Sequence, residues 1–294
     1  MPARPLIIGG QHIIFMAKHP PPGTRSDITN GDAVYLRAIT ENILGWSNPK
    51  ARLDKALASD DFLLLAQRIM ALKPRLQDQP FLEILLRLRE EEDNMLPPGG
   101  FFPVAEALDM LEDIDRWVVR HTITWCAASA EDANAPMCCV NLSTEALLNP
   151  DFSVYVRSQL KKQGVSGSRL CFEITESDAI AQPGAALKFI RALKPQGCRF
   201  TLDNFGSVKV SFAHIKDLPI DYLKIDGSII QNIITSSGDL ARARAISLTC
   251  QRLGIRAIAQ SVESKVVLAK LTEIGFDYAQ GFGIAHPVSL TNIR

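Results

Sequence analysis

The chain has 294 residues, 47% of them hydrophobic, and carries 32 basic and 32 acidic side chains. Without a net charge it has no overall field that would attract DNA or an anionic membrane, so neither is expected as a partner. No run approaches the ~20 apolar residues of a membrane helix, and the N-terminus lacks a sustained apolar region before a cleavage site, so we expect a cytoplasmic protein.

Residues 1–50 differ in character from the rest of the chain. Proline and glycine at 19–27 are typical of a linker, and 31–46 has the apolar spacing of an amphipathic helix. We expect a linker and helical appendage at 1–50 and one larger domain at 51–294. The helix either packs on the flank of that domain or belongs to an upstream regulatory module.

From residue 62 onward, short apolar runs rich in β-formers alternate with amphipathic segments. This alternation predicts an α/β fold, and eight such strands within about 230 residues predict a TIM-type (β/α)8 barrel. The predicted strands are 62–70, 81–88, 137–143, 169–175, 199–205, 220–226, 255–261 and 276–282.

One connection departs from the barrel pattern. Only ALKPRLQDQP, at 71–80, separates the first two strands, whereas a parallel crossover takes a dozen or more residues and usually a helix. The sequence therefore predicts a modified TIM barrel whose first strand is antiparallel.

Polar side chains stand where these strands end. Active sites of such barrels lie at the C-terminal ends of the strands. Each residue alone is as typical of a turn or a helix cap, but seven strands with polar endings predict a site. The residues are Glu83, Asn141, Glu173 with Glu176, Asp203 with Asn204, Lys224 with Asp226, Gln260 with Glu263, and Gln280.

The side chains of Glu83, Asn141, Glu173 and Asp203 offer oxygen donors, which suit a hard cation such as Mg²⁺ or Mn²⁺. Such an ion favours attack of water on a phosphodiester. Lys224 would hold the water or stabilise charge on the phosphoryl oxygens, or else form a buried ion pair with Asp226. The six cysteines and five histidines show no C-x-x-C or H-E-x-x-H spacing, so buried, reduced thiols are expected rather than a zinc or redox site.

Seven ordered motifs between about residues 52 and 288 resemble the EAL domain, a family of bacterial cyclic di-GMP phosphodiesterases and their inactive relatives. The resemblance implies a modified TIM barrel with an antiparallel first strand and a role in cyclic di-GMP signal transduction. The motifs are EILLR at 83–87, VNLS at 140–143, FEITES at 172–177, LDNFG at 202–206, LKID at 223–226, AQSVE at 259–263 and QGFGIAHP at 280–287.

The resemblance also implies roles for individual residues. Arg87, with its planar fork, is expected to contact a phosphate. The implied metal ligands are Glu83, Asn141, Glu173 and Asp203; the implied catalytic group comprises Lys224, Glu263, Gln260 and Asn204; the implied nucleotide-binding residues are Gln67, Arg87, Asp226 and Gln280.

Two of these positions depart from the family. Asn204 and Gln260 stand where the family has carboxylates, so a second metal ion should bind much more weakly. Loss of a group that positions or deprotonates water typically costs about 10²–10⁴-fold in rate, and weak or absent hydrolysis is expected. The loop SVKVS at 207–211 replaces the family's T-G-Y-S-S, which puts its coupling of the metals to dimerisation in doubt.

Three functions therefore remain open. The first is a degenerate receptor that binds cyclic di-GMP with little or no hydrolysis and needs no metal. The second is a slow phosphodiesterase that uses Mg²⁺ or Mn²⁺ and releases linear pGpG. The third is a scaffold that binds neither nucleotide nor metal and acts on a protein partner or a second copy of the chain.

Overall fold

The computed structural model describes residues 4–8, 11–15, 45–59, 61–74, 80–90, 94–129, 132, 134–206, 212–213 and 215–293. The predicted linker at 19–27, all but the last two residues of the predicted helix at 31–46, and the loop at 207–211 lie outside them. The chain forms two compact units, the first of Met1–Phe62 with Leu88–Met110 and the second, here the barrel unit, of Leu63–Arg87 with Leu111–Arg294.

All eight predicted barrel strands are present. They follow one another in the order β3-β11-β10-β9-β8-β7-β6-β4, and pairing of β3 with β4 closes the ring. Their bounds are β3 (Phe62–Ala71), β4 (Phe81–Arg89), β6 (Met137–Asn141), β7 (Leu170–Thr175), β8 (Arg199–Phe205), β9 (Tyr222–Ile225), β10 (Arg256–Ala259) and β11 (Tyr278–Ala279).

The first barrel strand runs against its neighbour, as the short connection at 71–80 predicts. Ala71 of β3 pairs with Tyr278 of β11 in antiparallel register, whereas each neighbouring pair of strands from β4 round the ring to β11 is parallel. The modified TIM barrel is thus confirmed. Its cause is chain length, because a connection this short has no room for a crossover helix.

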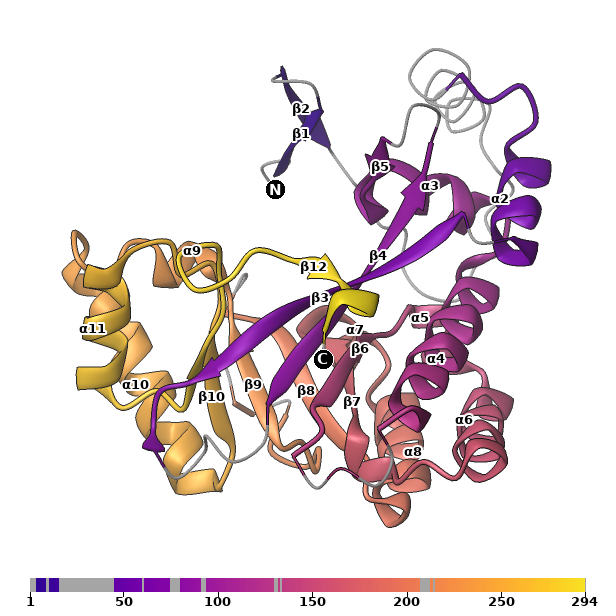
Figure 1. Ribbon diagram of the computed structural model, residues 1–294. Coiled ribbons are helices and arrows are strands. Elements are labelled where there is room, and N and C mark those ends of the chain that lie inside the picture. The colour runs from indigo at the N-terminus through magenta and orange to yellow at the C-terminus, as the bar shows by residue number, and fades with distance from the viewer. Residues whose placement is uncertain are drawn as a thin grey trace. The chain divides into compact units, whose positions relative to one another are not determined.

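Helices flank the strands of the barrel unit (Figure 1). Side chains of the residues just before the first helical residue cap several of them, as Ser143, Thr175 and Ser264 do, and left-handed glycines end others. The α-helices of this unit are α4 (Leu111–Ala127), α5 (Thr144–Leu148), α6 (Pro150–Gln163), α7 (Glu176–Ala181), α8 (Pro183–Leu193), α9 (Gly227–Ile230), α10 (Ser237–Leu253) and α11 (Lys265–Ile274). None of the helices searched in the described parts of the chain is both long and apolar enough to span a bilayer.

Further elements occur in both units. A short strand, β12 (Val288–Ser289), pairs antiparallel with β3 in the barrel unit. The first unit contains the antiparallel pair β1 (Arg4–Ile8) and β2 (Gln11–Phe15), together with β5 (Met95–Leu96), α2 (Pro49–Ala58) and α3 (Pro98–Ala107). The division of the chain into an appendage at 1–50 and a domain at 51–294 stays a prediction.

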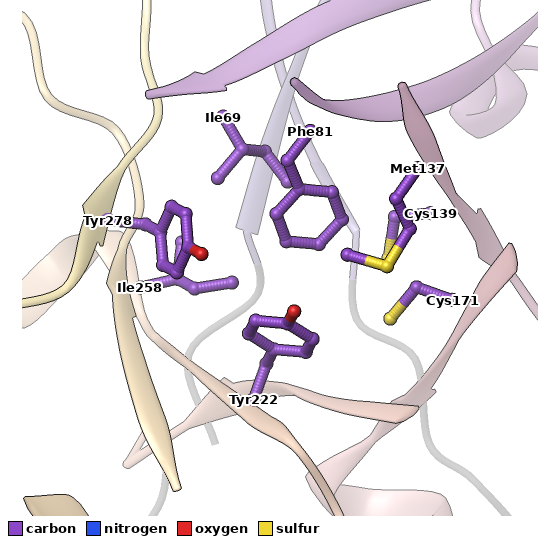
Figure 2. Packing of buried hydrophobic residues seen from close by; sticks show 8 residues of the cluster. All are labelled: Ile69, Phe81, Met137, Cys139, Cys171, Tyr222, Ile258 and Tyr278. Atoms are coloured by element: carbon purple, nitrogen blue, oxygen red, sulfur yellow. The ribbon is translucent and has the colours of Figure 1, made fainter. Parts of the chain in front are cut away.

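An apolar cluster fills the part of the barrel where the parallel strands begin (Figure 2). The ring of Phe81 lies 5.1 Å from that of Tyr222 and 5.8 Å from that of Tyr278. Cys139 and Cys171 complete one side of the same cluster. The barrel is therefore closed by packed side chains, and polar groups placed further along the strands rest on an apolar floor.

A buried acid on α4 should make stability depend on pH. The side chain of Asp115 is 6% exposed, and its Oδ2 accepts a 2.9 Å hydrogen bond from the backbone N–H of Ser143. Burial raises the pKa of Asp115 from 3.8 to about 7. An acid whose pKa rises on folding contributes stability below its unfolded pKa and loses that contribution as the pH rises through its folded pKa.

We therefore expect Asp115→Asn to flatten the fall in stability between about pH 4 and pH 7, by an amount on the order of 4 kcal/mol. Urea unfolding at several pH values measures it. Asp113→Asn, at an exposed position two residues earlier in the same helix, is the control and should leave the slope unchanged. Equal slopes for Asp115→Asn and the parent protein would show that Asp115 does not titrate in this way.

Candidate functional site

A polar layer lies two residues beyond the apolar floor. Side chains at i and i+2 of a strand share a face, so the inward position after each floor residue also points into the barrel. Phe81 is followed by Glu83 in this way, and Tyr222 by Lys224. The other members of the layer are Asn141 after Cys139, Glu173 after Cys171, Gln260 after Ile258, Gln280 after Tyr278, and Asp203 after Thr201, whose hydroxyl contacts the floor residue Cys171.

Lys224 lies at the centre of this layer. It is 0% exposed, and its Nζ is 2.8 Å from Oε2 of Glu83 and 2.5 Å from Oε1 of Glu173. These are the ion pairs that the structure shows for Lys224, so the alternative pairing with Asp226 is not what holds it. Asp226 instead caps α9 and accepts a hydrogen bond from the backbone N–H of Ser228.

Protein donors occupy both oxygens of Glu83 and of Glu173. Oε1 of Glu83 accepts a 3.0 Å hydrogen bond from Asn141, and its Oε2 accepts from Lys224 and, at 2.6 Å, from Gln280. Oε2 of Glu173 accepts from the thiol of Cys139 at 2.9 Å, while its Oε1 faces Lys224. Neither carboxylate has an oxygen without a partner.

The two side chains that depart from the family both donate to Asp203. The amide nitrogen of Gln260 lies 2.6 Å from Oδ1 of Asp203, and that of Asn204 lies 2.8 Å from its Oδ2. Together with Glu83 and Glu173, this makes three carboxylates whose six oxygens all accept hydrogen bonds from protein groups. Protein donors thus satisfy all three carboxylates of the polar layer.

Electrostatics keep Lys224 charged. Burial lowers the pKa of Lys224, but attraction by Glu173, Glu83 and Asp203 outweighs burial and raises that pKa well above its usual value. Burial raises the pKa of Glu173 and of Asp203, whereas for Glu83 the same effect is outweighed by Lys224 and the pKa falls. A protonated Lys224 can stabilise negative charge, but it is not available as a general base.

Left-handed backbone conformations occur near the end of β8 and just after β10. The register between β8 and β9 shifts between Leu202 and Phe205, and Asn204 within this irregular stretch has φ = 56°. Ser261, which follows Gln260, also has φ = 56°. Asparagine tolerates this left-handed region better than most residues, but serine does not share that advantage. The sequence reading did not single out Ser261.

The residues implied as nucleotide-binding fall into two groups. Gln280 belongs to the polar layer and Gln67 adjoins it: Oε1 of Gln67 accepts from Gln280 at 3.0 Å, and its Nε2 donates to the carbonyl of Ala285 at 2.9 Å. Arg87 is half-buried further along β4, and its guanidinium donates to the carbonyl of Leu86. Burial lowers the pKa of Arg87.

Glu263 is the implied catalytic residue that the structure does not bring into the layer. It is exposed, and no other described residue forms a hydrogen bond or ion pair with it.

Two aromatic side chains after Gln280 were not predicted as site residues from the sequence. The ring of Phe282, which is 60% exposed, stacks on that of His286 with centroids 4.9 Å apart. Both residues belong to the QGFGIAHP motif at 280–287, so the motif could have indicated them.

The fit of a metal ion differs between the two halves of the site. Across the described ranges, no group of three or more His, Cys, Asp or Glu side chains is arranged as a metal centre. Glu83, Asn141, Glu173 and Asp203 have the donor chemistry that suits one hard cation. Asn204 and Gln260 are neutral amides that hydrogen-bond to Asp203, so this half of the site lacks the two further negative charges that would attract a second cation.

Comparison with known proteins identifies the family. The family model described as "EAL domain" matches residues 50–287. The chain belongs to the EAL domain family.

This EAL domain is 32% identical to cyclic di-GMP phosphodiesterase PdeF of Escherichia coli over 258 residues, which is 88% of this chain and 34% of PdeF. It is 31% identical to cyclic di-GMP phosphodiesterase PdeB of Shewanella oneidensis over 241 residues, which is 82% of this chain and 28% of PdeB. The chain therefore spans about a third of the length of these relatives.

Solved structures share the EAL fold with this chain. The FimX EAL domain from Pseudomonas aeruginosa bound to c-di-GMP superposes with a TM-score of 0.77 at 28% identity, covering 83% of this chain and 97% of that one. The Xanthomonas citri FimX EAL domain in complex with c-diGMP gives a TM-score of 0.78 at 28% identity, with coverage of 88% and 99%. The modified barrel predicted from the motifs is thereby confirmed.

The strained backbone at Ser261 can be tested by substitution. A non-glycine residue in the left-handed region costs about 1–2 kcal/mol, so Ser261→Gly should raise the free energy of unfolding by roughly 1 kcal/mol. Urea unfolding measures the change. Ser237→Gly, at the first position of helix α10, is the control and should be neutral or destabilising. A loss of stability in Ser261→Gly would mean that packing of the serine side chain outweighs the strain.

Proposed function

We propose that this EAL domain is a receptor that binds cyclic di-GMP and hydrolyses it slowly or not at all. The observation that carries the proposal is the capping of both Asp203 oxygens by Gln260 and Asn204. Carboxylates at these two positions would repel Asp203 and need cations between them. The amides satisfy Asp203 by hydrogen bonding, so the pocket keeps its form without a second ion.

Retained binding positions support a nucleotide ligand. Arg87, Asp226, Gln67 and Gln280 all match the residues that the family resemblance implies for the dinucleotide. Arg87 projects a planar guanidinium, the group best suited to bidentate contact with a phosphate. The FimX EAL domains bound to c-di-GMP, with which this chain shares its fold, support the same ligand class.

Weak hydrolysis follows from the proton chemistry of the substituted side chains. A glutamine amide at 260 has no basic site for a proton from water, and the Lys224 ammonium is already protonated. What remains is electrostatic, because Lys224 can stabilise charge that develops on a phosphoryl oxygen. A divalent cation held by Glu83, Asn141, Glu173 and Asp203 would polarise the phosphodiester and lower the pKa of an attacking water.

The second candidate is a slow phosphodiesterase dependent on Mg²⁺ or Mn²⁺, with linear pGpG as product. The meeting of Glu83, Glu173 and Lys224 within 2.8 Å favours it, since this half of the site matches the family. A scaffold that acts on a protein partner or a second copy, and a cytoplasmic location, stay predictions of the sequence.

Binding and hydrolysis can be separated in one experiment. We expect titration calorimetry to show binding of cyclic di-GMP in EDTA with an affinity that Mn²⁺ changes less than tenfold, and chromatography after overnight incubation to show little linear product. Arg87→Ala should weaken binding by about 10-fold or more, the loss of one charge-assisted contact. Arg199→Ala, an exposed arginine at the opposite end of the barrel strands, is the matched control.

Three results discriminate the candidates. Absence of binding at tens of micromolar overturns the receptor and leaves the scaffold. Substantial linear product after overnight incubation with Mn²⁺ favours the slow phosphodiesterase instead. Equal losses in Arg87→Ala and Arg199→Ala would contradict the placement of the ligand at the C-terminal ends of the strands.

Carboxylates restored at positions 204 and 260 test whether the two amides limit metal binding and hydrolysis. In Asn204→Asp with Gln260→Glu, Asp203 loses two donors and gains two negative neighbours, so the metal-free protein should lose stability and Mn²⁺ should restore it. Hydrolysis should rise by about 10²–10⁴-fold. Thermal unfolding with and without Mn²⁺ gives a readout that does not depend on turnover.

The control for that variant is Asn204→Ala with Gln260→Ala, which removes the same two donors without adding charge. It should lose stability in the absence of metal and show no larger response to Mn²⁺ than the parent. If the acidic variant also shows no added response to Mn²⁺ and no gain in rate, the amides are not what limits this site.

A further inference from the structure

Two buried cysteines lie together behind the barrel wall. Cys126 is the next-to-last residue of α4 and Cys138 is the second residue of β6; both are 0% exposed, and their sulfurs are 3.8 Å apart. Neighbouring residues of a strand face opposite sides of the sheet. Cys139 points into the barrel (Figure 2), so Cys138 points outward, toward α4.

The buried guanidinium of Arg169 interacts with Cys126. Arg169 is 7% exposed, and it donates to the carbonyls of Pro136 and Ser129 at 2.9 Å and to the hydroxyl of Ser129 at 3.2 Å. No Asp or Glu among the described residues lies within 4.0 Å of its nitrogens. An unpaired buried cation is costly, and a thiolate nearby is one means of compensating it.

The environment divides the two thiols chemically. The hydrogen bond with Cys138, with further help from the charge of Arg169, lowers the pKa of Cys126. The same hydrogen bond and burial raise the pKa of Cys138 well above its usual value. Cys126 is therefore the better nucleophile, and Cys138 holds its proton as a resolving thiol should.

We propose that Cys126 and Cys138 form an oxidisable thiol pair that closes to a disulfide between α4 and β6. With a peroxide as oxidant, the Cys126 thiolate attacks one peroxide oxygen and the O–O bond breaks, which gives a sulfenic acid and, after protonation, one water. The Cys138 sulfur then attacks the sulfenic sulfur, its proton leaves with the hydroxyl as a second water, and the S–S bond forms. Two thiols lose two electrons in total, and the peroxide gains them.

The disulfide would act on the strand that supports the candidate site. Its sulfurs must approach from 3.8 Å to about 2.05 Å, which draws β6 and the end of α4 together. β6 also carries Cys139, which donates to Glu173, and Asn141, which donates to Glu83. Oxidation therefore places a covalent constraint directly behind two donors of the polar layer.

Thiol counting on the intact chain tests the pair. The protein is treated with hydrogen peroxide, quenched with catalase, unfolded and alkylated, and its mass is measured. We expect four of the six cysteines to be alkylated, with the Cys126 peptide joined to the peptide that contains Cys138. Reduction before alkylation should restore all six.

Variants decide which neighbour is the partner. Cys139→Ser should keep the cross-link, whereas Cys138→Ser and Cys126→Ser should lose it, because only the outward thiol of the adjacent pair faces α4. Cys250→Ser, at another buried cysteine, is the control for loss of any thiol. Circular dichroism establishes that each variant is folded, and Cys126→Ala replaces Cys126→Ser if the latter is not.

Two outcomes would overturn the inference. One is alkylation of all six cysteines after treatment, and the other is a cross-link that survives in Cys138→Ser but disappears in Cys139→Ser. The assay needs neither nucleotide nor metal, so its failure and the failure of the proposed receptor function are separate results.

Discussion

The buried charge of Lys224 is the constraint on which the polar layer depends. An ammonium group with no exposure would cost several kcal/mol if it were left alone in the barrel. Glu83 from β4 and Glu173 from β7 compensate it, while Lys224 itself comes from β9. Because these strands are not neighbours in the ring, the ion pairs fix carboxylates across the barrel and above its apolar floor. Every other donor in the layer is then positioned against carboxylates that cannot move freely.

Charge balance explains why amides at 204 and 260 change the character of the site. Lys224 compensates at most one of the three carboxylates, and burial already raises the pKa of Glu173 and of Asp203. Carboxylates at both substituted positions would make five acids around one lysine, an arrangement that only cations stabilise. The amides of Asn204 and Gln260 donate N–H groups to Asp203 instead. The pocket therefore has less negative charge to attract a metal ion, and its hydrogen bonds form without one.

Much of the fold could be predicted from local patterns in the sequence. Alternation of strand and helix gave the barrel, and the length of 71–80 gave the antiparallel β3, because chain reach limits a crossover. Polar side chains at the ends of the predicted strands indicated most of the polar layer. The thiol of Cys139 on Glu173 was not predictable, because it depends on how two strands pair. Nor was the left-handed Ser261, since only tertiary packing holds a serine there.

The polar layer also extends to the chain's last segment. Gln280 donates to Glu83 and to Gln67, and Gln67 donates in turn to the carbonyl of Ala285. That carbonyl belongs to the loop that carries Phe282 and His286 and leads into β12, which pairs with β3. Oε1 of Gln280 is buried and accepts no hydrogen bond from any described residue. A group that donates to this oxygen would bind the side chain that connects Glu83, through Gln67, to the loop at Ala285. The hydrogen bonds of the polar layer and the position of this loop therefore depend on each other.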